Sequence, residues 1–85
     1  MGHRIELGEI EQISLKQEGI NQVCCIYDKD RIQLFYSGEL DKREVSELLK
    51  VRMPSYMLPN KIIKLENLPI NSNGKIDRQK LLGGL

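Results

Sequence analysis

The sequence predicts an α+β domain, in which a small three-stranded sheet with a hairpin is flanked by two main helices and a short C-terminal helix. The chain has 85 residues, which is enough for one hydrophobic core. Helical and strand-like apolar patterns alternate in the order helix, hairpin, helix, strand, loop and short helix. The composition, 40% hydrophobic and 29% charged, is typical of a globular chain.

The first helix is expected over residues 9–18. Leu7, Ile10 and Ile13 recur at three-residue spacing and would share one helix face. Acidic residues fall in the first turn, where the helix dipole favours anions. Gly19 is well placed to end the helix.

Two strands follow, over residues 22–27 and 32–37. The first is a continuous apolar run from Val23 to Tyr27, and the second alternates apolar and polar residues. Residues 28–31 form a polar turn between them, so the two strands are expected to pair as an antiparallel hairpin.

The two cysteines are adjacent within the first of these strands. Cys24 and Cys25 would point to opposite faces of the sheet, which makes them poor disulfide partners. The chain has one histidine and no Cys-x-x-Cys pair, so no zinc site is expected. These features predict a reduced, cytoplasmic protein without a metal.

A second helix is expected to begin at Asp41. Asp41 can cap it, and Glu44, three residues later, completes a capping-box pair. Leu40 and Val45 have the spacing of a hydrophobic staple around this cap. Pro54 ends the helix, because proline disfavours helical conformation in the residue before it.

The C-terminal part contains a third strand, a loop and a last helix. Residues 61–65 are rich in isoleucine and predict the strand, and residues 66–75 are turn-like. Asp77 can cap a short helix that carries Leu81 and Leu82.

The loop before that helix carries the clearest chemical signal. Asn73 and Gly74 form a tight-turn dipeptide, and Lys75 follows it, projecting into solvent or into a partner's cleft. A lysine ammonium there suits negative charge that develops on phosphate or carboxylate oxygens. The same residues also fit an ordinary surface loop, with Asp77 as a helix cap and Arg78 as a surface residue.

The opening segment is the second unusual feature. Residues 4–7 alternate polar and apolar side chains as a short edge strand would. No upstream segment of this chain can pair with that strand, so the chain is expected to begin within a larger structure.

Charge and hydropathy exclude several classes of function. The net charge is +1, which gives no general attraction to nucleic acid or to an anionic membrane. The longest apolar run is about five residues, too short for a transmembrane helix, and no signal segment opens the chain. Nothing indicates an obligate oligomer, and we expect a monomer.

Three segments together resemble a known family. Residues 2–11 (GHRIELGEIE), 53–59 (MPSYMLP) and 68–78 (LPINSNGKIDR) are similar, in order, to motifs of amino-acid adenylation domains. These domains belong to the adenylate-forming superfamily. The sequence of the first segment is similar to the corresponding motif of nonribosomal peptide synthetases and amino acid–carrier-protein ligases. The resemblance covers residues 1–85 as a single domain, the C-terminal subdomain of such an enzyme.

The resemblance implies a role for each residue of the lysine-bearing segment. Lys75 matches the catalytic lysine of the family, which contacts the substrate carboxylate and oxygens derived from ATP during adenylation. Asn73, Gly74, Asp77 and Arg78 would support the loop that carries it, with Gly74 allowing close approach of the backbone.

The opening segment would form a second face of the same subdomain. Gly2, Arg4, Glu6 and Gly8 match the family's loop that lines the tunnel for a phosphopantetheine thiol after the subdomain has rotated. Arg4 and Glu6 would shape or anchor that loop, and Gly8 would begin the first helix.

The implied reaction needs components that this chain is expected to lack. ATP with Mg²⁺ and the amino-acid substrate would be bound mainly by a large N-terminal adenylation subdomain, absent here, and the phosphopantetheine by a carrier protein. The isolated chain is therefore not expected to be active.

Two alternatives remain at the level of sequence. The chain can be a freestanding interaction module that docks on a carrier protein or on a separate adenylation core, using basic residues of the second helix: Lys42, Arg43, Lys50 and Arg52. Nucleic-acid binding through the basic C-terminal segment is disfavoured by the low net charge and the absence of tryptophan.

Overall fold

The computed structural model of the protein describes residues 6–83. Its strands have the spatial order β1-β2-β3; β1 and β2 are antiparallel, and β2 and β3 are parallel. The predicted α+β fold with a three-stranded sheet and a hairpin is confirmed, and the sheet is mixed. The elements in chain order are α1 (Leu7–Leu15), β1 (Ile20–Asp28), β2 (Arg31–Gly38), α2 (Lys42–Arg52), the 3-10 helix η1 (Ser55–Met57), β3 (Lys61–Lys64) and α3 (Arg78–Leu82).

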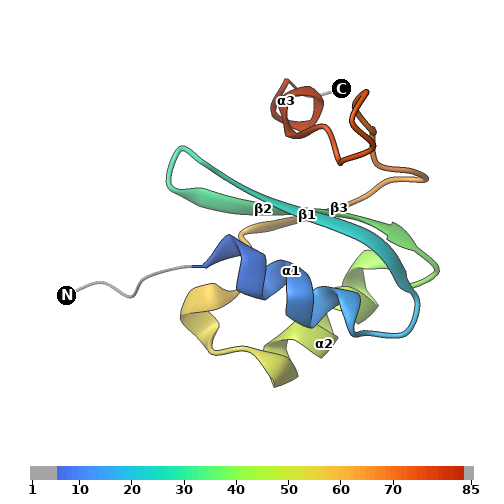
Figure 1. The fold of residues 1–85 in the computed structure, drawn as a ribbon. Coiled ribbons are helices and arrows are strands. Elements are labelled where there is room, and N and C mark those ends of the chain that lie inside the picture. The colour runs from blue at the N-terminus through green and yellow to red at the C-terminus, as the bar shows by residue number, and fades with distance from the viewer. Residues whose placement is uncertain (1–5, 84–85) are drawn as a thin grey trace.

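The sheet separates two apolar layers. Helices α1 and α2 cover one face, and α3 with the loop before it lies over the other (Figure 1). Cys24 and Cys25 are both free and buried, and they fall in different layers, as their adjacent positions in β1 predict. The larger cluster, between the sheet and α1 and α2, contains Ile10, Ile20, Val23, Cys25, Ile32, Leu34, Tyr36, Val45, Leu49, Met53 and Met57. The smaller cluster, on the α3 side, contains Cys24, Ile26, Phe35, Leu68 and Leu81.

Local sequence signals explain the hairpin and α2. Lys29 and Asp30 both have positive φ at the tip of the hairpin, in the turn expected over residues 28–31. The predicted capping box of α2 is present: the Glu44 backbone N–H donates to the Asp41 carboxylate, and the Asp41 N–H donates to the Glu44 carboxylate.

The N-terminal boundaries differ from the prediction. Leu7 is the first residue of α1 and not part of a strand, and residues 4 and 5 lie outside the described residues. The helix also ends at Leu15, earlier than expected. Lys16 closes the last turn by donating to backbone carbonyls, and Gly19, with a φ of 96°, instead turns the chain into β1.

Candidate functional site

The predicted lysine lies in a small hairpin that we call the lysine loop, residues 70–76. Ile70 and Ile76 pair as an antiparallel bridge at its base. The Asn71 N–H donates to the Lys75 carbonyl at 2.7 Å, and the Gly74 N–H donates to the Asn71 carbonyl at 3.0 Å. These bonds give the loop a defined backbone conformation on the α3 side of the sheet.

Asn71 organises this loop through its side chain. Its Oδ1 accepts from the Asn73 N–H at 2.9 Å and from the Lys75 N–H at 3.1 Å. The sequence patterns did not single out Asn71, although asparagine side chains commonly bond to backbone N–H groups two residues ahead. Asn71, rather than Asn73, therefore supplies the side chain that fixes the turn.

Gly74 is required for its backbone conformation. Its φ is 80°, in the left-handed region, whereas Asn73 is not among the residues with positive φ. A Cβ at Gly74 would meet no heavy atom within 4 Å in the described part of the chain. Within residues 6–83, the glycine is therefore needed for the turn, and no close contact requires it.

Lys75 follows this turn and is exposed. Its ammonium has no ion-pair partner within residues 6–83. Beside it in the loop, Ile70 is half exposed. An ammonium in this position is a hydrated point charge, and it can exchange its water for anionic oxygens of a ligand.

Asp77 and Arg78 lie at the C-terminal base of the loop. The Asp77 N–H donates to the Pro69 carbonyl at 2.8 Å, and its carboxylate accepts from the Lys80 N–H, which confirms the predicted helix cap. Arg78 is the first residue of α3 and reaches back across the edge of the sheet.

Arg78 is not a simple surface residue, which was the other interpretation that the sequence allowed, because its guanidinium binds two other residues. Its Nη1 donates to the Cys25 carbonyl at 2.8 Å, and its Nη2 donates to Oε2 of Glu11 at 3.0 Å. The same Oε2 accepts from the Cys25 N–H at 2.7 Å. Glu11 was not predicted as a site residue, because no local sequence pattern relates it to a residue as distant in the chain as Arg78.

Gln22 holds the other end of the same segment. Its Oε1 accepts from the Leu68 N–H at 3.0 Å and from the Ser37 hydroxyl at 2.7 Å. Leu68 is also buried in the smaller cluster. Residues 68–78 are therefore attached to β1 at both ends.

The residues of the predicted second face are only partly described. Gly2 and Arg4 lie outside the described residues. Glu6 precedes α1, and its carbonyl accepts from the N–H groups of Glu9 and Ile10. Gly8 is exposed and is the second residue of α1, so the helix begins one residue before it.

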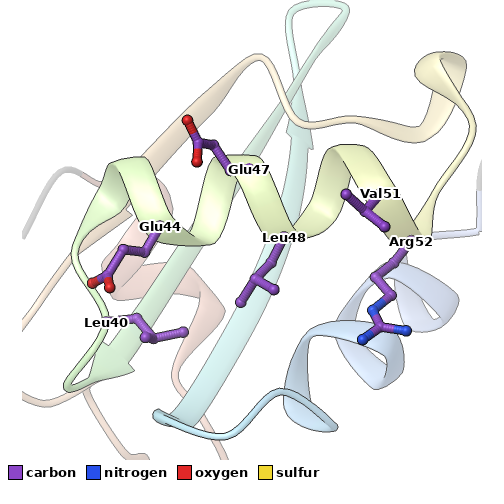
Figure 2. Close-up of a pocket in the computed structure, with 6 residues that line it drawn as sticks. All are labelled: Leu40, Glu44, Glu47, Leu48, Val51 and Arg52. Carbon is purple, nitrogen blue, oxygen red and sulfur yellow. The ribbon is translucent and has the colours of Figure 1, made fainter.

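Two open grooves lie away from the lysine loop. One, of about 420 Å³, runs along α2, where Leu48 and Arg52 extend from one side of the helix (Figure 2). Its lining is Leu40, Glu44, Glu47, Leu48, Val51 and Arg52. The other, of about 510 Å³, is lined by residues that include Phe35, Lys42 and Lys61. Neither groove is lined by Lys75 or by another residue predicted for the lysine loop or the second face, although Arg52 and Lys42 of the alternative docking surface line one groove each.

Residues 6–83 contain no cluster of three or more histidine, cysteine, aspartate or glutamate side chains able to hold a metal ion. Within the same range, no helix is both long and apolar enough to cross a membrane.

No protein-family model matches the chain. Curated relatives do match it. The chain is 38% identical over 87 residues to tyrocidine synthase 3 from Brevibacillus parabrevis, and 33% identical over 89 residues to an L-proline--[L-prolyl-carrier protein] ligase from Streptomyces coelicolor. Each match covers 94% of this chain, but the chain spans only 1% and 17% of the lengths of these relatives.

Solved structures share the fold. Klebsiella oxytoca NpsA, in complex with 3-hydroxyanthranilyl-AMSN, superposes with a TM-score of 0.87 at 26% identity, over 98% of this chain and 18% of that chain. A four-domain nonribosomal peptide synthetase bound to AMP and glycine gives a TM-score of 0.77 at 34% identity, over 92% and 6% of the respective chains.

Proposed function

Because the chain belongs to the C-terminal subdomains of amino-acid adenylation domains, part of the adenylate-forming ligases, we propose that it is the mobile lid of an amino-acid adenylating ligase. In this role the lid closes over a large N-terminal adenylation subdomain, which binds ATP and the amino acid. It then turns to present its second face to a carrier protein.

Lys75 acts in the first half-reaction of this proposal. A carboxylate oxygen of the amino acid attacks the α-phosphorus of ATP, the bond from that phosphorus to the bridging oxygen breaks, and pyrophosphate leaves. The reaction brings two anions together and spreads charge over the phosphoryl oxygens. The Lys75 ammonium offsets this charge in the transition state.

The observation that carries this role is the combination of a fixed backbone and an unpaired charge at Lys75. Asn71 and Gly74 define the loop, and the exposed ammonium has no ion-pair partner within residues 6–83. A preorganised cation loses less freedom on reaching the reacting oxygens than a mobile one would.

Mg²⁺ does not fit the described part of this chain, since residues 6–83 offer no cluster of metal ligands. In the proposal it accompanies ATP in the large subdomain, and no step assigned to this chain passes through it.

The second half-reaction uses the second predicted face. The phosphopantetheine thiol of the carrier protein attacks the carbonyl carbon of the aminoacyl adenylate. The bond from that carbon to the phosphate oxygen breaks, AMP leaves, and the thiol proton is lost to solvent. Gly2, Arg4, Glu6 and Gly8 line the path of the thiol, with Arg4 and Glu6 shaping it and not acting as nucleophiles.

The proposal places a monomeric protein in the cytoplasm. Its two free cysteines are buried on opposite faces of the sheet, which is compatible with a reducing compartment.

The test is Lys75→Ala in the intact adenylating protein, with Lys80→Ala as the matched control on an exposed lysine of α3. We expect adenylation, measured by ATP–pyrophosphate exchange, to fall by about 100-fold or more, because a charge-stabilising group is removed. Transfer from a supplied aminoacyl adenylate to the carrier protein should be unchanged. Equal loss of both half-reactions, or full adenylation in the variant, would refute the assignment.

A further inference from the structure

We propose that Glu11 and Arg78 are positioning residues for Lys75, which lock the base of the lysine loop to β1 and α1. The lysine loop and α1 would then turn as one rigid unit. This inference rests on the proposed function, because Lys75 must work in adenylation for its position to matter.

The Glu11–Arg78 pair connects α1, α3 and β1 through the backbone of one residue, Cys25. Glu11 comes from α1, Arg78 from α3 and Cys25 from β1, which is an edge strand of the sheet. The Glu11 carboxylate accepts from the Cys25 N–H, and the Arg78 guanidinium donates to the Cys25 carbonyl. These side chains thus satisfy both outward backbone groups of Cys25, on a strand edge that pairs with no other strand within residues 6–83.

The environment of this contact distinguishes it from an ordinary surface ion pair. The Glu11 side chain is 18% exposed and that of Arg78 is 53% exposed, with a nitrogen–oxygen distance of 3.0 Å. The Arg43–Glu47 pair on α2 is 88% and 69% exposed, at 3.9 Å. A partly shielded, charge-assisted contact with two further backbone hydrogen bonds holds geometry better than an exposed pair does.

A short and bonded path connects the pair to Lys75. Arg78 follows Lys75 by three residues, and the two residues between them are themselves held: Ile76 pairs with Ile70, and the Asp77 N–H bonds to the Pro69 carbonyl. Gln22 holds Leu68 at the other end of the segment, so release of Arg78 removes the hydrogen-bonded attachment to β1 at the end nearer Lys75. A displacement of about 1 Å at a reacting group can lower a rate by up to about 100-fold.

The experiment compares Glu11→Ala, Arg78→Ala and the double variant in the intact adenylating protein. We expect each single variant to lower kcat for adenylation by about 10-fold, with KM for ATP and for the amino acid unchanged. The effect of the double variant should be smaller than the two single effects combined, because both variants remove the Glu11–Arg78 contact, although each also removes its own hydrogen bond to Cys25. Transfer from a supplied aminoacyl adenylate should be retained.

Loss of adenylation with retained transfer distinguishes a positioning defect from a folding defect, since an unfolded subdomain would lose both half-reactions. Glu11→Gln keeps an acceptor for the Cys25 N–H and should restore part of the rate. Amide hydrogen exchange in the 85-residue chain gives a readout without activity. The Asn73 and Lys75 amides should exchange faster in Glu11→Ala than in the control Glu47→Ala.

The inference fails if the Glu11 and Arg78 variants adenylate normally, if the two half-reactions fall equally, or if their effects add in the double variant. Lys75→Ala, measured alongside, separates this failure from that of the proposed function. If Lys75→Ala abolishes adenylation and the Glu11 and Arg78 variants do not impair it, only the positioning role is wrong. If Lys75→Ala adenylates normally, the proposed function itself is wrong.

Discussion

The backbone of Cys25 forms hydrogen bonds with Glu11 and Arg78, and its thiol is buried in the larger cluster. Burial, and then the nearby Glu11 carboxylate, raises the pKa of the Cys25 thiol from 9.0 to about 12. The folded state therefore keeps this proton at a pH where the unfolded chain has lost it. The resulting stability is fully present below pH 9 and declines as the pH rises toward 12.

This asymmetry predicts the alkaline stability of the protein. Between pH 9 and 12, the Cys25 thiol should lower the free energy of unfolding by up to about 1.4 kcal/mol per pH unit. Urea unfolding of the wild type and of Cys25→Ala at several pH values measures the slope that this thiol contributes. Other alkaline groups, such as the buried Tyr36, titrate in both proteins and cancel in the comparison. Parallel slopes for the two proteins would contradict the prediction.

Among the elements, α2 depends most clearly on a local signal. The Asp41 carboxylate accepts from the Glu44 N–H at 2.8 Å, and this bond satisfies a helix N–H that has no partner within the helix. We expect Asp41→Ala to lower the free energy of unfolding by about 1 kcal/mol. Asp41→Asn keeps the acceptor and should retain most of that stability. If the two variants unfold at the same urea concentration, the cap does not stabilise α2.

The elements that short-range patterns specify are those that the sequence predicted well. The capping box, the polar hairpin turn and the alternation of Cys24 and Cys25 each depend on residues a few positions apart. The boundaries of α1 were wrong at both ends. Gly19 appeared to end the helix, but the final turn closes earlier, at Lys16, and the glycine begins the entry to β1.

The candidate site was predictable to a similar extent. The turn signal placed Gly74 and Lys75 in the loop, and the capping preference of aspartate placed Asp77 before α3. The Glu11–Arg78 contact joins residues 67 positions apart, and the parallel pairing of β2 with β3 depends on a crossover through α2. Such contacts arise from the packing of the whole chain, so periodicity and turn signals give no information about them.

At the scale of the whole molecule, the proposed function requires a surface that completes a site elsewhere. The lysine loop lies on the α3 side of the sheet and α1 on the other (Figure 1), and the Glu11–Arg78 pair connects them around the β1 edge. The two grooves described above are open, and neither contains Lys75. In the proposed function, the Lys75 charge acts on ATP and a carboxylate, so it needs a second domain or protein that holds those substrates.

The large subdomain can belong to the same polypeptide as this chain or to a separate protein. The two possibilities predict different sizes for the natural protein. If the chain is the lid of an adenylating ligase, an antibody to this domain should detect, in an extract of the source cells, a band several-fold larger than 9.8 kDa. The expectation follows from relatives in which the matching segment is 1% to 17% of the protein. The purified 85-residue chain serves as the size marker. A single band at the size of the marker would favour the freestanding module. Lys42, Arg43, Lys50 and Arg52, all exposed on α2, would then be the first residues to test for docking on a carrier protein or a separate adenylation core.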